Sequence, residues 1–372
     1  MGYQIVVGGL SIFIVIVLGA PVWVFAVIEA FSYGIGAFFA YTGGMLADRF
    51  GAKRIAIIGN SLIPVLSFTG LFRNYAAAGS MYITGWWSRN LRSPPRKTLL
   101  IESSTPQDRS KAFGFLHGLD VGGGIIASVL LITLYELGYP FFDHILISIV
   151  PMIISTFLIV ATKKTNRERI EESDKPTKEE TRTTTGIFIV TALFGFSYFS
   201  IGFPILTAAQ TTSSIVSGLF VYPIFMIFSA LGGFVYSRTK IKKEIKQLGI
   251  FGYALAGLGT IGIFLVLLLH LNIEAYYLAV AVLGLGMSSV ETFEPSIISK
   301  IVRGTKAGTG MGKLSFFRSI GMFSGNIIVG LLYLISPEYS YLYAASVSVV
   351  AAAVVLITGS SFSERRHSQS GL

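Results

Sequence analysis

Seven charged side chains lie within stretches of this sequence that are otherwise apolar. They are Glu29, Arg89, Arg92, Asp120, Glu291, Glu294 and Arg318. An acid or base at the centre of a membrane span costs about 2.5–3.5 kcal/mol on insertion scales, so seven unpaired groups facing lipid would cost roughly 20 kcal/mol. These groups must therefore face a watery cavity, pair with one another, or lie close enough to the membrane surface to reach water. Their chemistry suggests a charged path for a polar solute, or a gate made of ion pairs.

The spacing of these charges places them on a few helix faces. Arg89, Arg92 and Arg96 are related as i, i+3 and i+7, so they share one face. Glu291 and Glu294, three residues apart, share a face at the corresponding depth of a later span. The first half thus offers mainly bases and the second mainly acids, and the two halves are complementary in charge.

The neighbouring spans complete this pattern. At a rise of about 1.5 Å per residue, Arg96 and Lys97 fall at the membrane boundary, where we expect them to snorkel to the surface. Asp120 and Arg318 occupy corresponding positions in the spans that follow. Each half can therefore nearly neutralise itself, so permanent pairing within the halves is the alternative to a gate between them.

Three side chains are candidates for carrying a coupling proton. Glu29 lies about 10 Å below the outer face of its span, where desolvation of a lone carboxylate favours its protonated form. A hydrogen-bonded structural group is the alternative. His117 and Asp120 share a helix face, which suggests a proton relay, although a histidine that is simply hydrogen-bonded near the interface would show the same pattern.

The elements that must position these groups are membrane spans. The chain has 372 residues, of which 52% are hydrophobic and 13% charged, against roughly 25% charged in soluble domains. A span needs about 20 mostly apolar residues. Twelve stretches qualify: 3–19, 22–43, 55–72, 75–98, 112–135, 142–162, 186–207, 214–236, 248–270, 275–299, 311–335 and 340–360. We predict an all-α integral membrane protein with twelve transmembrane helices. The short first stretch leaves open whether that span is complete.

The basic residues indicate the orientation. Of the 29 lysines and arginines, 23 fall in connections on the side of residue 1, and Arg73 alone falls on the other side. Basic residues concentrate in cytoplasmic loops, so we expect a multi-pass protein of the cell membrane with both termini in the cytoplasm. The net charge of +10 is then a topology signal, and nucleic acid is not an expected partner.

The polar run 163–185 divides the chain into two pseudo-symmetric lobes. We predict an N-terminal six-helix lobe (1–162), a cytoplasmic linker (163–185), and a C-terminal six-helix lobe with a short cytoplasmic tail (186–372). The halves echo each other, because Gly43–Arg49 and Gly232–Arg238 each close the second span of their half with a Gly-Gly pair and an arginine. Internal repeats of this kind build many secondary transporters, with the site between the halves.

The connection Gly44–Arg54 carries the most specific motif. Its sequence, GMLADRFGAKR, closely resembles the loop G-x-L-A-D-R-x-G-R-K of major facilitator superfamily transporters. The matching residues are Gly44, Leu46, Ala47, Asp48, Arg49, Gly51 and Lys53, while Ala52 stands where a base is usual and Arg54 follows it. We expect the glycines to form a tight turn. The resemblance implies a two-lobed fold and transport by alternating access.

Two further expectations follow from the resemblance. In that superfamily the acid of this loop contacts the start of the eleventh span and a base of the fourth, and so holds the lobes together. Here this means that Asp48 meets Gly308–Gly310, where free N–H groups and a helix dipole favour an anion, and that the base is Arg89 or Arg92. The family's fourth, fifth, tenth and eleventh helices close the cytoplasmic side, which makes the charged groups a candidate gate. The stretch Arg92–Ser103, with His117 and Asp120 after it, resembles a prokaryotic branch of permeases within the superfamily.

No enzyme motif is present. The chain lacks cysteine, which excludes disulfides and thiolate metal sites, and it has no dinucleotide or Walker pattern, so we expect no cofactor. The expected partners are a small-molecule solute, a coupling proton and the lipid bilayer, with the chain acting as a monomer. Efflux of amphiphilic compounds, lipid flipping, and a sensor or scaffold without transport are the alternatives. Trp86 could line such a path, although aromatic packing is its simpler role.

Overall fold

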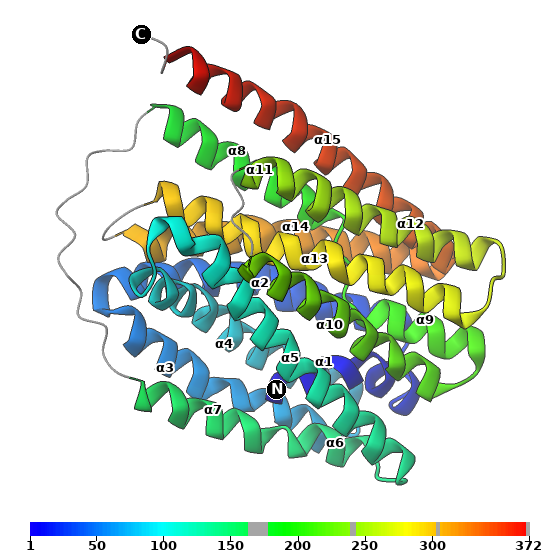
Figure 1. Cartoon of the computed structure of the whole chain (residues 1–372). Coiled ribbons are helices and arrows are strands. Elements are labelled where there is room, and N and C mark those ends of the chain that lie inside the picture. The colour runs from blue at the N-terminus through cyan, green and yellow to red at the C-terminus, as the bar shows by residue number, and fades with distance from the viewer. Residues whose placement is uncertain (163–177, 239–242, 303–305, 370–372) are drawn as a thin grey trace.

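The computed structural model describes residues 1–162, 178–238, 243–302 and 306–369, with only the backbone described for 178–179 and 358–369. Figure 1 shows a bundle of long helices, and no strand occurs within these ranges. The helices of the first half (blue to green in the lower part) and of the second half (green to red in the upper part) form two groups. The predicted all-α architecture is confirmed.

The helices of each half are as follows. The first half contains α1 (Gly2–Ser11), continued by a π-helical segment (Ile12–Val17), α2 (Val22–Phe50), α3 (Ala52–Leu62), continued by a 3₁₀ segment (Ile63–Leu71), α4 (Tyr75–Glu102), a 3₁₀ turn (Pro106–Asp108), α5 (Arg109–Glu136), α6 (Phe141–Ile147) and α7 (Ile149–Ala161). The second half contains α8 (Lys178–Phe196), α9 (Gly202–Thr212), α10 (Ile215–Arg238), α11 (Glu244–Gln247), continued by a π-helical segment (Leu248–Ala254) into α12 (Leu255–Leu268), α13 (Ile273–Ile301), α14 (Ala307–Ile335) and α15 (Pro337–Gln369).

Nine helical runs in the described part are long and apolar enough to cross a membrane. Three further rods complete the predicted twelve, and each departs from a simple span for a visible reason. The run Gly2–Val17 is short, α4 carries four basic residues between Arg89 and Lys97, and the α8–α9 rod is interrupted at residues 197–201. Charges and broken helix at membrane depth are tolerated only where protein or a water-filled cavity surrounds them. These rods are therefore the first place to look for a site.

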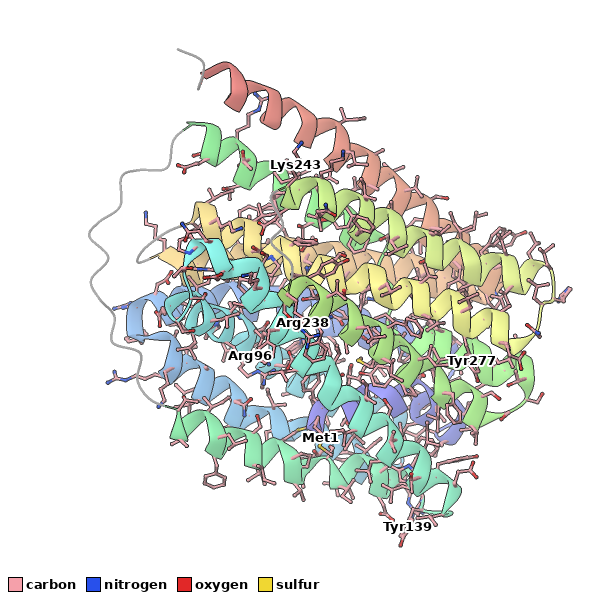
Figure 2. All side chains as sticks on the ribbon, viewed as in Figure 1. Met1, Arg96, Tyr139, Arg238, Lys243 and Tyr277 are labelled. Carbon is pink, nitrogen blue, oxygen red and sulfur yellow. The ribbon has the colours of Figure 1, made fainter. Side chains whose placement is uncertain are left out.

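The bundle has two ends, which we name here by their connections. The linker end is where α7 stops at Ala161 and α8 begins at Lys178, and the far end carries the turns at 137–140 and 269–272. In Figure 1 the linker end is on the left and the far end on the right. Tyr139 and Tyr277 lie at the far end in Figure 2, whereas Arg96 lies nearer the linker end.

The connection between α2 and α3 is shorter than its motif suggests. Helix α2 continues through Gly44 and Asp48 to Phe50, and Gly51 alone joins it to α3 with a φ of +94°, a conformation that favours glycine. The prediction that glycines form the turn is right for Gly51 and wrong for Gly44. Gly44 lies where α2 crosses α14. A Cβ at this position would come within 2.2 Å of the Gly308 carbonyl oxygen, so the close crossing requires glycine.

Two helix pairs join the halves. Helix α2 packs along α14, and α5 packs along α10. At the linker end of the second pair, a Cβ on Gly114 would lie 2.8 Å from the Gly233 carbonyl oxygen, and small residues of this kind let helix backbones approach closely. Helix α8 begins at Lys178, inside the predicted linker 163–185, so the end of that segment is helical. Residues 163–177 of the predicted linker lie outside the described residues.

Candidate functional site

A cavity of about 260 Å³ lies between the two halves. Helices α1, α2, α4 and α5 of the first half line it, together with residues of α8, α10, α12, α13 and α14 of the second. The predicted groups at its wall are Glu29, Arg89, Arg92, His117, Asp120, Glu291 and Arg318. Glu294 is buried beside it with no exposed surface. The structure thus brings together charged groups from five separate spans.

One face of α4 changes from aromatic to basic along the cavity. Tyr82, Trp86 and Arg89 are spaced i, i+4 and i+7, so they lie on the same face. The Tyr82 and Trp86 rings stack with centroids 5.5 Å apart, and Tyr33 of α2 meets Trp86 edge-on at 5.6 Å. The Arg89 Cζ lies 4.5 Å from the Trp86 ring centroid. The wall is therefore aromatic toward the far end and cationic toward the linker end.

Arg89 and Arg92 have aromatic and neutral partners. Their Cζ atoms lie 5.0 and 5.9 Å from the ring centroid of Tyr3 in α1. Arg92, which is 7% exposed, donates a hydrogen bond from Nη1 to Asn60 Oδ1 at 2.8 Å. Among the described residues neither arginine forms an ion pair, and the buried Nε of each has no hydrogen-bond partner. Both guanidinium groups are thus held at the cavity wall without a carboxylate.

Ion pairs within each half link neighbouring helices. Arg96 of α4 donates from Nη2 to Asp120 Oδ2 of α5. In the second half, Arg318 of α14 pairs with both Glu291 and Glu294 of α13, and its Nε lies 3.0 Å from Glu294 Oε2. The two sets join corresponding helices with the signs of charge exchanged. They therefore neutralise much of the charge within each half.

Lys97 supplies an ion pair between the halves. Its Nζ lies 4.0 Å from Glu291 Oε2, and the two side chains are 16% and 30% exposed. The prediction that Arg96 and Lys97 snorkel to the membrane surface is wrong, because both side chains line the cavity. A neutral contact also crosses between the halves, where His117 Nε2 of α5 lies 2.8 Å from Ser229 Oγ of α10.

Glu29 is enclosed in the first half, with only 2% of its surface exposed. The Tyr82 hydroxyl donates to Glu29 Oε1 at 3.2 Å. No ion pair to Glu29 occurs within the described part of the chain. A carboxylate that is buried, hydrogen-bonded by a phenol and open to the cavity matches both interpretations of this residue, proton carrier and structural group.

The halves also touch on the far-end side of the cavity. The hydroxyl oxygens of Tyr33 in α2 and Tyr198, which lies in the break between α8 and α9, are 3.1 Å apart. The rings of Phe25 and Phe203 meet edge to face with centroids 5.1 Å apart. Aromatic contacts between the halves therefore close this side.

Asp48 joins the halves at the linker end. Its Oδ1 accepts a hydrogen bond from the Gly308 N–H at 2.8 Å, and its Oδ2 accepts from the Thr309 N–H at 2.7 Å and from the Thr309 hydroxyl at 2.6 Å. These N–H groups belong to the first turn of α14, where the helix dipole favours an anion. The contact between Asp48 and the start of this span is the one that the sequence predicts.

The bases of the same motif have separate positions. Lys53 donates from Nζ to the Val160 carbonyl oxygen at 2.9 Å and also to the Thr162 carbonyl, so it caps the end of α7. The Arg49 Cζ lies 5.1 Å from the Phe50 ring centroid, and Arg54 is exposed. Of these bases, Lys53 has a defined structural contact, which ties the start of α3 to the end of the first half.

Comparison with known proteins agrees with this architecture. The family model described as Major Facilitator Superfamily matches residues 1–325. The chain belongs to this superfamily. The quinolone resistance protein NorA of Staphylococcus aureus is 24% identical over 326 residues, covering 85% of this chain and 82% of NorA. An uncharacterised MFS-type transporter of Methanocaldococcus jannaschii is 22% identical over 336 residues, covering 84% and 80% of the two chains.

Solved structures of the major facilitator superfamily share the fold. The proton:xylose symporter XylE of E. coli has a TM-score of 0.73 at 13% identity, covering 95% of this chain and 91% of XylE. The human organic anion transporter TETRAN has a TM-score of 0.69 at 11% identity, covering 94% and 89% of the two chains. The protein is therefore a multi-pass membrane transporter with the superfamily fold, as predicted.

Within this fold, the cavity wall contains groups that the sequence did not single out. Lys97 is the base between the halves, Asn60 holds Arg92, and Tyr82 bonds Glu29. Trp86, for which packing was the simpler expectation, lines the cavity and supports the guanidinium of Arg89. The i, i+4, i+7 spacing of Tyr82, Trp86 and Arg89 was a usable signal, but Asn60 and Lys97 could be placed only by their neighbours in space.

Proposed function

We propose that this transporter moves a small polar solute across the cell membrane by alternating access, coupled to a proton gradient. The observation that carries the proposal is the cavity between the halves, which has direct contacts between the halves on either side of it. In alternating access, one set of contacts must break while the other holds, and the solute site stays near the repeat interface.

The contacts at the linker end form the proposed cytoplasmic gate. In this proposal the Asp48 contact and the Lys97–Glu291 pair break when the cavity opens toward the linker end, because both connect the two halves. The Arg96–Asp120 pair stays intact, because it lies within one half. The pairs that Arg318 makes likewise keep the second half together. The contacts between the halves thus form the gate, and the ion pairs within each half are permanent.

The orientation of the proposal rests on the basic residues. The connections on the linker-end side carry 23 of the 29 lysines and arginines, and such residues concentrate on the cytoplasmic side. The linker end is therefore assigned to the cytoplasm, together with both termini, and the far end to the outside of the cell membrane.

Glu29 is the proposed proton carrier. It lines the cavity, it has a tyrosine hydroxyl as its hydrogen-bond donor, and the ion pairs within the described residues do not include it. A buried carboxylate without a basic partner is costly to ionise, so its protonation can be linked to the presence of a solute. Asp120 is less suited to carry the proton because it forms an ion pair with Arg96. His117 is less suited because it is hydrogen-bonded to Ser229.

Efflux of amphiphilic compounds is the second candidate function. The aromatic wall formed by Tyr33, Tyr82, Trp86 and Phe194 favours it, since aromatic rings hold apolar groups while a few polar groups orient the ligand. NorA, whose name describes quinolone resistance, is a relative of similar length. The direction of the gradient-driven flux distinguishes uptake from efflux.

Reconstitution in proteoliposomes tests the proposed function. Uptake of radiolabelled solute should be measurable for at least one solute of a polar panel, and a pH gradient should increase it. Glu29→Gln should abolish the response to the gradient and leave solute exchange at equal pH within about twofold of the unmodified chain. Glu274→Gln, which changes an exposed acid at the far end, is the matched control.

Two results would contradict the proposal. Absence of flux for every solute, with the protein correctly folded, would favour a sensor or scaffold. Flux that ignores the pH gradient in the unmodified chain would remove proton coupling and leave transport by another gradient.

A further inference from the structure

The charges around the cavity do not cancel. The groups that neutralise one another in ion pairs are Arg96, Lys97, Arg318, Asp120, Glu291 and Glu294. Among the described residues at the cavity wall, the charged groups outside these pairs are Glu29, Arg89 and Arg92. Two bases against one acid leave the wall with excess positive charge, and this excess increases whenever Glu29 is protonated.

The two arginines are arranged so that they can bind an anion. A buried charge is stable only with a partner that replaces its hydration. Here Tyr3 and Trp86 offer ring faces, and Asn60 offers one amide oxygen. The Nε of Arg89 and of Arg92 remains without a hydrogen-bond partner in the part that the structure describes. A guanidinium fork fits a carboxylate with two parallel hydrogen bonds.

We propose that Arg89 and Arg92 bind the acidic group of an organic anion, and that this anion is the class of solute that the transporter carries. The proposal rests on the proposed function, because it takes the cavity to be the solute path. The other bases at the wall are less suited to this role, since Arg96, Lys97 and Arg318 already have carboxylate partners.

The aromatic part of the wall indicates the rest of the solute. On α4, the rings of Tyr82 and Trp86 follow directly from Arg89 toward the far end, and Tyr33 packs edge-on against both Trp86 and Tyr198 at the cavity wall. Aromatic rings prefer stacked or edge-to-face contacts with a ligand ring. The cavity has a volume of about 260 Å³. A monocyclic aromatic carboxylate matches this size and polarity.

Three probes of nearly equal shape test the charge selectivity on the unmodified chain. Benzoate, benzamide and benzamidine share one ring and carry negative, zero and positive charge. Binding to the purified full-length protein in nanodiscs is measured by calorimetry and by quenching of tryptophan fluorescence, since Trp86 lies at the site. We expect benzoate to bind at least about tenfold more tightly than benzamide, and benzamidine not to bind. Acetate should bind more weakly than benzoate, because it lacks the ring.

Variants test the assigned residue. Arg89→Gln should weaken benzoate binding about 10- to 100-fold and leave benzamide binding unchanged, while Arg89→Lys should give an intermediate affinity. Arg73→Gln is the matched control, because Arg73 also lies over a ring, that of Phe142 at 5.7 Å, but does not line the cavity. Thermal unfolding verifies that each variant is folded. If Arg89→Gln is not folded, the affinities of the three probes for the unmodified chain decide whether the anion site exists.

The outcomes separate this inference from the proposed function. Equal affinity for benzoate and benzamide, or preference for benzamidine, would overturn the anion site even if proteoliposomes carry a neutral or cationic solute. Benzoate binding that depends on Arg89 without any flux would support the anion site and overturn the proposed function. Binding and counterflow of benzoate that are both lost in Arg89→Gln would support the two together.

Discussion

Replacing Asp48 with asparagine should destabilise the state in which the linker end is closed. The carboxylate uses one oxygen for the Gly308 N–H and the other for Thr309. Asparagine keeps one acceptor oxygen and presents an NH₂ group to the other donor. The loss of one charge-assisted hydrogen bond is worth about 1.5–3 kcal/mol, and the loss of charge at the start of α14 about 0.3–1 kcal/mol. A total of about 2–4 kcal/mol changes the equilibrium roughly 30- to 700-fold.

Cysteine labelling can measure this shift without background. The chain contains no cysteine, so Ser315→Cys on α14, at the cavity wall, is a single reporter. In proteoliposomes with the linker end outward, a membrane-impermeant maleimide should label this residue at least about tenfold faster when Asp48→Asn is added. Transport should slow in the same variant, because the closed state is depleted. The affinity for benzoate should change less than twofold, because Asp48 is not part of the cavity wall.

The reasoning has a matched control and a clear point of failure. Asp108→Asn removes an exposed acid near the same end, which accepts a hydrogen bond from Thr105 within its own turn, and should leave labelling and transport unchanged. If Asp48→Asn behaves like this control in both measurements, the contact with α14 does not hold the linker end closed, and the proposed latch is refuted.

Two further predictions use the same reporter. Gly114→Ala should increase labelling and abolish most transport, because the new Cβ would lie 2.8 Å from the Gly233 carbonyl oxygen. Gly122→Ala on the same helix is the control and should change neither, because its Cβ would meet no atom within 4 Å. Equal effects of the two variants would contradict the role of close packing. Lys97→Met removes a partly exposed pair with Glu291, worth about 0.2–1 kcal/mol, so labelling should increase no more than about fivefold. An effect as large as that of Asp48→Asn would show that the pair between the halves is stronger than its geometry indicates.

Much of the fold could be predicted because its causes are local. An apolar run of about 20 residues must become a helix in a bilayer, since backbone polar groups there have no water to bond. The contact of Asp48 with the start of α14 was predicted from the resemblance to the superfamily's loop, and the free N–H groups of a helix start explain why an acid suits this position. The turn was less well predicted, because the local pattern does not distinguish Gly51, which has the positive φ, from Gly44, which packs against α14.

The partners of the charged groups could not be predicted in the same way. The sequence places Arg92 and Lys97 on the same span, but only the structure shows that Arg92 bonds Asn60 while Lys97 reaches Glu291 of the other half. That outcome depends on how each helix is rotated about its axis and where it crosses its neighbours, and both depend on contacts between residues far apart in the chain. Small differences in rotation exchange one partner for another, so periodicity alone cannot decide between them.

By itself, then, the sequence determined that this protein spans a membrane in twelve helical segments, that its halves repeat, and that its charged groups within the spans cannot face lipid unpaired. Each of these conclusions follows from the cost of placing polar groups in lipid, which every residue meets independently. Only the tertiary structure decided which charges cancel and which are left over at the cavity wall. The excess positive charge at Arg89 and Arg92 depends on how all the helices around the cavity pack. Among the described residues, the other acids at the wall are paired with other bases, and Glu29 is buried without a basic partner.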